Sequence, residues 1–126
     1  MEIKLKVNEV LGLNHFLKTI IDNDKVKINV LLKFRLLGIM HSIESHITNF
    51  EIIKNEKIIE YGEEDENGIY QISTDKPDAM ENFKKDIRQV LDSEVTININ
   101  MLKPDEVFDQ GLTSEYLMGL YPIICE

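Results

Sequence analysis

Two short stretches of the chain alternate apolar with polar residues. The first is EIKLKV at residues 2–7, and the second is EVTININ at residues 94–100. A period of two is typical of a strand that buries one face. We therefore predict a short strand in each stretch and expect the two strands to pair with each other.

Between these stretches the apolar residues recur at helical spacing. Residues 10–21 carry one apolar face, and Asn8 is a suitable residue to cap the start of this first helix. Further along, Pro77 is followed by acids, a pattern typical of a helix start. We expect this later helix to run to about Ser93.

The longest helical signal covers residues 25–61, which contain no proline and one glycine. At 1.5 Å per residue, the predicted helix is about 50 Å long. Such a helix is longer than a compact domain of this size is wide, so part of it must project or pack on another chain. Its apolar seam repeats at steps of four and three and consists of Leu32, Leu36, Ile39, Ile43, His46, Phe50, Ile53 and Lys57.

Additional apolar residues widen the early half of this helix beyond a coiled-coil seam. We expect several neighbouring elements there and fewer toward the C-terminal end. The additional positions are Ile28, Leu31, Leu37, Met40 and Ile47.

His46 is a polar residue at a seam position. A polar side chain in an apolar seam must find a partner and can fix the register or the oligomeric state of a helix pair. The alternative is a partly exposed histidine near the projecting end of the helix. Both interpretations stay open.

Together these signals predict a mainly helical α+β fold. We expect a long helical hairpin with a short N-terminal helix, a small sheet of two or three strands and two short C-terminal helices. The hairpin tip is expected at about 62–75 and the helical tail at about 103–124, within a single domain of residues 1–126.

Composition and charge narrow the function. With 43% hydrophobic and 29% charged residues, the composition is that of an ordinary globular protein. The net charge is −9, and residues 61–126 alone hold 15 acids and 5 bases. Because nucleic-acid binding needs clustered basic charge, we expect no direct nucleic-acid binding.

The sequence also indicates a cellular location. The chain lacks a long apolar leader, and no stretch approaches the roughly 18 apolar residues of a membrane span. A single cysteine, Cys125, excludes an intrachain disulfide and favours a reducing compartment. We interpret it as a bystander thiol because no histidine is near it in sequence. We therefore expect a cytoplasmic protein with no membrane contact.

Motifs for catalysis or metal binding are weak. In HSIESH, residues 41–46, the two histidines are about 140° apart around a helix, so they cannot converge on one ion. There is no glycine-rich phosphate loop and no nucleophile elbow. We therefore predict no catalytic residue, no metal, no cofactor and no enzymatic activity.

An acidic run precedes an apolar stretch in EYGEEDENGIYQI, residues 60–72. With Gly68 at the obligatory sixth position of a calcium loop, carboxylate and amide residues fall on positions one, three and five. Position twelve, which needs a bidentate Glu, is Thr74. We therefore interpret the run as a turn in which Asn67 and Gly68 take positive φ. The acids keep this tip soluble, unless they are the surface that a partner recognises.

Three segments carry a resemblance to a known family. They are MEIKLKVNEVLGLNHFLKTI, NEKIIEYGEEDENG and FKKDIRQVLDSEV. Together they resemble a family of small uncharacterised proteins encoded by bacteriophages and prophages of Gram-positive bacteria. The resemblance covers about residues 1–100, and the closing GLTSEYLMGLYPIICE departs from it. It implies a phage gene, often one for morphogenesis or host takeover, and carries over no functional residue.

Two functions from different classes follow as predictions. The first is a non-enzymatic, oligomeric structural or assembly factor, located in the cytoplasm of the bacterial host or associated with the virion, that binds a phage or host protein. The second is a small acidic inhibitor of a host defence system or of a host nucleic-acid enzyme. The candidate interaction residues lie on the seam and near the tip, and are Leu36, Ile39, Ile43, His46, Phe50, Ile53, Tyr61, Asp65, Glu66 and Tyr70.

Overall fold

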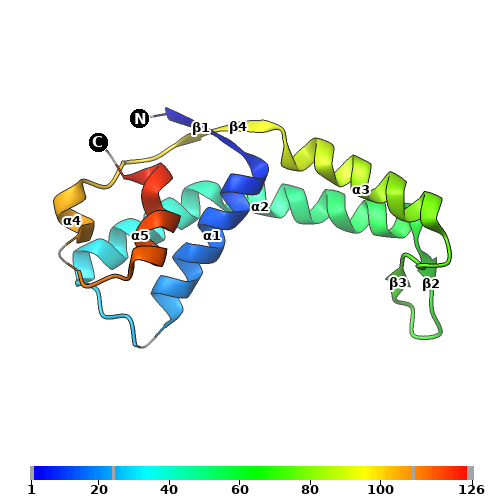
Figure 1. The fold of residues 1–126 in the computed structure, drawn as a ribbon, viewed down its shortest axis with the longest axis horizontal. Coiled ribbons are helices and arrows are strands. Elements are labelled where there is room, and N and C mark those ends of the chain that lie inside the picture. Colours follow the sequence, from blue (N-terminus) through cyan, green and yellow to red (C-terminus); the bar gives the residue numbers. More distant parts are fainter. Residues whose placement is uncertain (1, 24, 109, 125–126) are drawn as a thin grey trace.

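The molecule is elongated, with a thicker head at one end and a narrower arm at the other (Figure 1). The computed structural model describes residues 2–23, 25–108 and 110–124. We call residues 2–23, 25–49, 92–108 and 110–124 the head and residues 50–91 the arm. In chain order the elements are β1 (Glu2–Lys6), α1 (Val7–Asp22), α2 (Val30–Tyr61), β2 (Glu63–Glu64), β3 (Tyr70–Gln71), α3 (Pro77–Leu91), β4 (Glu94–Asn98), α4 (Pro104–Phe108), α5 (Ser114–Leu120) and a 3₁₀ turn, η1 (Tyr121–Ile123).

These elements confirm the predicted fold class. The fold is mainly helical, with one long helix, a short N-terminal helix, small two-stranded sheets and short C-terminal helices. The short helix α5 begins after Thr113, whose side chain accepts a hydrogen bond from the backbone N–H of Tyr116. Threonine is a common residue at this position, because its hydroxyl can accept from a free backbone N–H of the first turn.

β1 and β4 form an antiparallel pair, as their alternating residues predicted. The register runs from Glu2 opposite Asn98 to Lys6 opposite Glu94. The pair connects the start of α1 to the end of α3 (Figure 1). It therefore holds together the head end of the long hairpin.

The cap of α1 differs from the prediction. Lys6 is the cap residue, and its backbone N–H donates a hydrogen bond of 2.9 Å to the Glu9 carboxylate. Asn8 lies inside the first turn, so the prediction that it caps the helix is wrong. The strand β1 runs without a break into α1, and an acid in the first turn satisfies the free N–H that this leaves.

α2 begins at Val30 instead of at residue 25. The Asn29 side chain accepts a hydrogen bond of 2.8 Å from the backbone N–H of Leu32. The backbone N–H of Asn29 itself donates to the side-chain oxygen of Gln110 at 2.9 Å. Because both contacts satisfy groups at the helix start, the helix does not extend toward Lys25. Its end at Tyr61 is as predicted.

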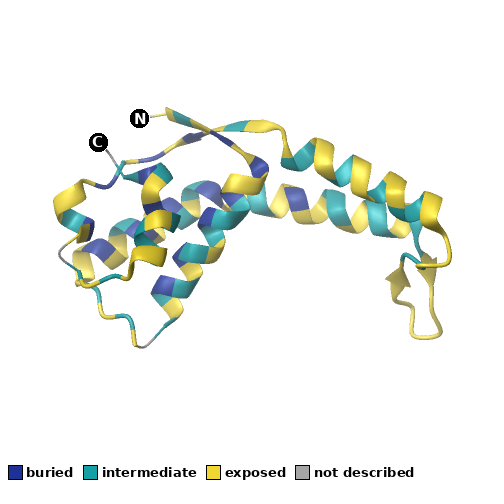
Figure 2. Cartoon of the chain, viewed as in Figure 1, coloured by how far each residue is buried: buried dark blue, intermediate teal, exposed yellow. Residues whose placement is uncertain are grey.

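Burial is concentrated in the head (Figure 2). There α2 packs on α1 and β4, and α5 packs on α1. Among the described residues no polar or charged side chain is buried. The side chains that are fully buried come from both halves of the sequence and include Val10, Leu17, Ile20, Leu32, Leu36, Ile43, Ile97, Leu102, Val107, Leu120 and Ile123.

Arg35 connects α2 to the segment that follows β4. Its guanidinium donates hydrogen bonds of 3.0 and 2.8 Å to the two carboxylate oxygens of Glu106 and one of 2.8 Å to the carbonyl of Met101. A bidentate pair of this kind is directional as well as attractive. It therefore fixes where residues 101–106 lie beside α2.

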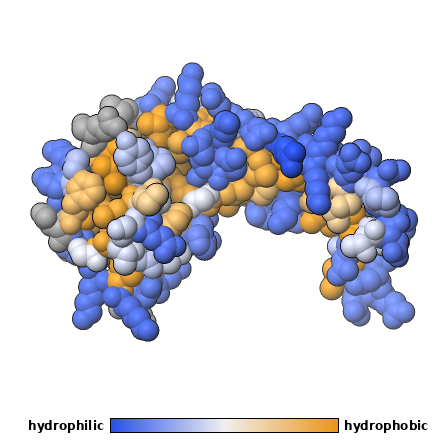
Figure 3. Space-filling view, in the orientation of Figure 1, coloured by the Kyte–Doolittle hydropathy of each residue, from blue (hydrophilic) through white to orange (hydrophobic). Residues whose placement is uncertain are grey.

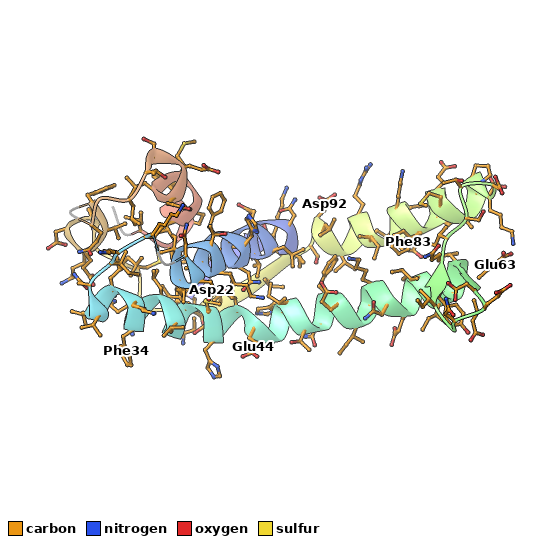
Figure 4. The ribbon with its side chains drawn as sticks, turned by 90° about the horizontal axis from the view of Figure 1, so that it is seen from below. Asp22, Phe34, Glu44, Glu63, Phe83 and Asp92 are labelled. Carbon is orange, nitrogen blue, oxygen red and sulfur yellow. The ribbon has the colours of Figure 1, made fainter. Side chains whose placement is uncertain are left out.

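The arm consists of the second half of α2 and of α3, which lie side by side and antiparallel (Figure 1). On the face shown in Figure 3, hydrophilic residues cover most of the arm, and the head shows more hydrophobic surface. α3 contains no buried residue, and Phe83 lies half-buried between α3 and α2 (Figure 4). None of the helices in the described ranges has the length and apolar character that crossing a membrane requires.

The β2–β3 hairpin closes the arm. The Asp65 carboxylate accepts hydrogen bonds of 2.8 and 2.9 Å from the backbone N–H groups of Asn67 and Ile69. Gly68 has a φ of 80°, as predicted, but no described residue other than glycine has a positive φ. The prediction for Asn67 is therefore wrong. Asp65 already holds the turn, so only one residue needs the left-handed conformation.

Candidate interaction surface

The seam of α2 is covered by its own chain. Leu36 and Ile43 are 0% exposed, Ile39 is 3% exposed and Phe50 is 8% exposed. The first three belong to one apolar core with α1, β4 and the C-terminal segment. These side chains are not available to a partner in this fold, so our interpretation of them as an interaction surface is corrected. The seam is used inside the monomer because α1, β4 and α3 are all present to cover it.

The other seam candidates lie on the same inner side of α2. His46 and Ile53 are half-buried, in keeping with the smaller number of neighbours toward the arm. His46 is therefore neither fully buried nor on the outer face of the helix. Its predicted role in fixing an oligomeric state stays a prediction.

A different apolar surface lies on the outer side of α2 in the head. We call it the head patch, and it consists of four residues. Figure 4 shows that Phe34 points away from the rest of the molecule. Because the burial of apolar area is the main favourable term in protein association, an exposed group of large apolar side chains indicates a contact site. The residues and their exposed fractions are Val30, 84%; Leu31, 62%; Phe34, 73%; and Leu37, 46%.

The head patch borders two shallow hollows between α2 and the chain that follows β4. Their volumes are about 670 Å³ and 490 Å³. Phe34, Arg35 and residues 99–100 line both hollows. Since Arg35 fixes the position of residues 101–106, the floor of this surface is held in place by the same ion pair that connects α2 to α4. The patch is therefore presented on a defined support.

The sequence contained a signal for the head patch that we interpreted differently. Leu31 and Leu37 were taken as additional positions that several neighbouring elements would cover. The structure places those neighbours on the opposite side of α2, so the residues remain exposed. Phe34 was not assigned to any face. Its spacing of three residues from both Leu31 and Leu37 is the signal that could have identified the patch.

The tip candidates are partly brought together. Asp65, Glu66 and Tyr70 all lie on the β2–β3 hairpin and are exposed. The Tyr70 hydroxyl reaches Glu64 at 3.4 Å, and Glu63 pairs with Lys76. Asp65 folds the turn. A large share of the acidic run therefore has a role within the hairpin, and the exposed Glu66 is the member most directly presented to solvent.

Tyr61, the remaining candidate, lies at the base of the tip and connects the two arm helices. Its hydroxyl donates a hydrogen bond of 2.6 Å to Asp86. This bond, with burial and the negative charge of Asp86 adding to it, raises the pKa of Tyr61. The Lys57 ammonium lies 2.7 Å from Glu60 and 3.7 Å from Asp86. Hydrogen bonding to Glu60 raises the pKa of Lys57, although partial burial opposes this shift.

The histidines and acids of the described residues do not form a metal site. His41 is on the outer side of α2, its side chain 88% exposed, and its ring nitrogen lies 3.4 Å from Glu44. In the part of the chain that the structure describes, no three His, Cys, Asp or Glu side chains are grouped so that they could hold a metal ion.

Comparison with known proteins adds no relative to this description. No protein-family model matches the chain, and neither the curated proteins nor the solved structures give a significant match. The residues of the interaction surface are therefore the evidence for its role.

Proposed function

We propose that this protein acts by protein–protein interaction, as an oligomeric structural or assembly factor encoded by a phage, and not as an enzyme. The observation that carries the proposal is the head patch. Four large apolar side chains are exposed side by side on one helix face, at a cost of about 25 cal/mol for each Å² left in water. A bound protein removes this cost.

The shape of the molecule supports the same function. The head presents the patch, and the arm carries an acidic hairpin away from the head core (Figure 1). Two separated surfaces on one rigid helix suit a protein that holds two other components at a fixed spacing. The phage context and the location in the host cytoplasm or in the virion rest on the sequence resemblance and are part of the proposal.

The ionisable groups of the arm also fit a protein without catalytic activity. Active sites commonly contain ionisable groups whose pKa is shifted by burial in a cleft. Tyr61 and Lys57, whose pKa values are raised, instead belong to a structural network between the arm helices. The inhibitor hypothesis has weaker support, because two acids of the acidic run already have partners in the chain: Glu63 pairs with Lys76, just before α3, and Asp65 holds the hairpin turn.

A photo-crosslinking experiment tests the proposed function. A benzophenone amino acid replaces Phe34 in the chain made in its native host, and the matched control carries it at Phe108, which is 56% exposed on α4. We expect protein adducts of defined mass from position 34 and at least several-fold fewer from position 108. Adducts with particle proteins or with another copy of the chain support the assembly function.

Two outcomes contradict the proposal. Equal labelling from positions 34 and 108, or none from position 34, would show that the head patch contacts no protein. An adduct with a host defence protein or a nucleic-acid enzyme would instead support the inhibitor function.

A further inference from the structure

The outer side of α2 carries a continuous stripe that extends beyond the head patch. Figure 4 shows α2 along one edge of the molecule, with Phe34 and Glu44 pointing away from the other elements. Exposed residues follow one another along this side at alternating steps of three and four residues, which is the spacing of a contact between two helices. The residues of this outer stripe are Leu31, Phe34, Gly38, His41, Ser45, Thr48, Ile52, Asn55 and Ile59.

Residue size changes along the outer stripe in a symmetric way. Large apolar residues lie at its two ends, with Phe34 73% exposed at one end and Ile59 54% exposed at the other. The two central residues, Ser45 and Thr48, are small, and His41 and Ile52 flank them. Small residues at the centre of a helix pair let the backbones approach, and large ones at the ends then interdigitate. If a second copy of the helix packed antiparallel, the Phe34 end of one helix would lie against the Ile59 end of the other.

Charge of opposite sign lies at the two ends of α2, mostly in the segments that flank the helix. Residues 25–41 contain four lysines or arginines and no acid, whereas residues 51–66 contain seven acids and two lysines. A parallel pairing would place like charges together, which is unfavourable. An antiparallel pairing places the basic end of one helix beside the acidic end of the other.

We propose that the partner of this surface is a second copy of the chain, packed antiparallel along the outer stripe of α2. This inference rests on the proposed function, because it names the occupant of the same head patch. Phe34 lies next to Ile59 of the second copy, and a two-fold axis passes between Ser45 and Thr48. Both copies use the same residues, as a closed two-fold interface requires.

The dimensions of the outer stripe indicate how strongly two copies should associate. From Leu31 to Ile59 it is about 42 Å long, and a third of a helix circumference over that length gives on the order of 500 Å² per copy. The total of roughly 1,000 Å² is at the lower limit for a specific interface. Association should therefore be weak and depend on protein concentration. The molecular mass in solution must be measured at protein concentrations from low micromolar to several hundred micromolar.

Sedimentation tests whether a dimer exists. The full chain is expected to shift from one copy toward two as the concentration rises. Phe34→Glu should weaken this association at least about tenfold, because the two-fold symmetry places a charge at the apolar contact at both ends of the interface. The matched control Phe108→Glu changes an exposed phenylalanine outside the stripe and should shift the midpoint less than about twofold. Circular dichroism verifies that both variants are folded.

Disulfide trapping tests the direction of packing. In a Cys125→Ser background, an affinity-tagged Phe34→Cys chain is mixed with an untagged Ile59→Cys chain under mild oxidation. The antiparallel dimer predicts rapid formation of the mixed product. Phe34→Cys alone should cross-link slowly, because its two cysteines would lie about 37 Å apart along the axis.

The outcomes separate this inference from the proposed function. Faster cross-linking of Phe34→Cys alone than of the mixture overturns the antiparallel arrangement. A chain that stays monomeric at every concentration and gives no disulfide product overturns the second copy as the occupant. In that case photo-adducts of position 34 with another protein keep the proposed protein–protein interaction but not its oligomeric form, and their absence removes the proposed function as a whole.

Discussion

The head and the arm share one helix, yet α2 is buried very differently in the two regions. Its seam has the same spacing throughout, but Leu36 and Ile43 are 0% exposed in the head, whereas Ile53 in the arm is half-buried. In the head, α1, β4 and the C-terminal segment cover the inner side of the helix, whereas in the arm α3 covers it, with only β3 beside its end. Spacing therefore identifies which face turns inward, and the number of neighbours decides how deeply it is buried.

This difference gives the two regions different stabilities. A side chain surrounded on all sides gains more from leaving water than one that touches a single helix. Regions with few buried apolar contacts open at lower free energy than the core does. The arm should therefore open locally while the head remains folded, and each of the following predictions tests that separation.

The largest effect is expected from shortening a side chain in the head core. Leu36→Ala should lower the free energy of unfolding by about 2–5 kcal/mol, because the residue is fully enclosed and its loss leaves a cavity. The matched change in the arm, Ile87→Ala, affects a half-buried residue and should cost about 1 kcal/mol. Urea denaturation followed by circular dichroism measures both values.

If Leu36→Ala and Ile87→Ala lowered the free energy of unfolding equally, the head and the arm would not differ in stability. Hydrogen exchange gives a second measurement of the same comparison. With Ile87→Ala, faster exchange should be confined to the second half of α2 and to α3. With Leu36→Ala, it should extend to the whole chain, because the head core is the last part to open.

The sequence predicted the elements well because each has a local signal. The β1–β4 pairing, the end of α2 and the start of α3 at Pro77 all follow from periodicity or from a residue with restricted geometry. The start of α2 was missed although Asn29 is a common cap residue, and its side chain accepts a hydrogen bond from the N–H of Leu32. The bond from the backbone N–H of Asn29 to Gln110, far away in sequence, has no local signature.

The candidate surface was harder to predict, for a related reason. The seam residues and the head patch are both apolar faces of α2, and the sequence does not say which one the chain itself will cover. That choice depends on where β1 pairs with β4 and on how Arg35 and Glu106 place the tail. The stronger periodic signal belonged to the core, as expected for the face with the most neighbours.

The second largest effect is expected from adding volume to the head. A methyl group on Gly119 of α5 would overlap the ring of Phe16 on α1. Gly119→Ala should therefore destabilise the protein by about 1–3 kcal/mol. The control Gly12→Ala lies in α1 with open space around it and should stabilise it by up to about 1 kcal/mol through helix propensity. Thermal unfolding measures both, and a neutral Gly119→Ala would mean that α5 packs loosely on the head.

The smallest effect concerns the arm alone and depends on pH. The hydrogen bond to Asp86 raises the pKa of Tyr61 above its ordinary value of 10.0. The bond to Glu60 raises the pKa of Lys57 above 10.5. A group whose pKa is raised by folding stabilises the folded state fully below its ordinary pKa, and this contribution is lost as the pH rises through the raised value. The stability of the arm should therefore be constant to about pH 10 and then decrease.

Tyr61→Phe and Asp86→Asn separate this network from the rest of the chain. Tyr61→Phe removes the hydrogen bond between α2 and α3, and Asp86→Asn removes the negative charge but leaves an amide oxygen that can accept from the hydroxyl. Both should reduce the alkaline loss of stability, and Tyr61→Phe should weaken the arm slightly at neutral pH, by less than Ile87→Ala does. Hydrogen exchange in α3 between pH 7 and 10.5, after correction for the intrinsic rate, measures this effect. If Tyr61→Phe keeps the wild-type dependence on pH, the hydroxyl contributes nothing to the arm, and packing of the half-buried faces alone holds the two helices together.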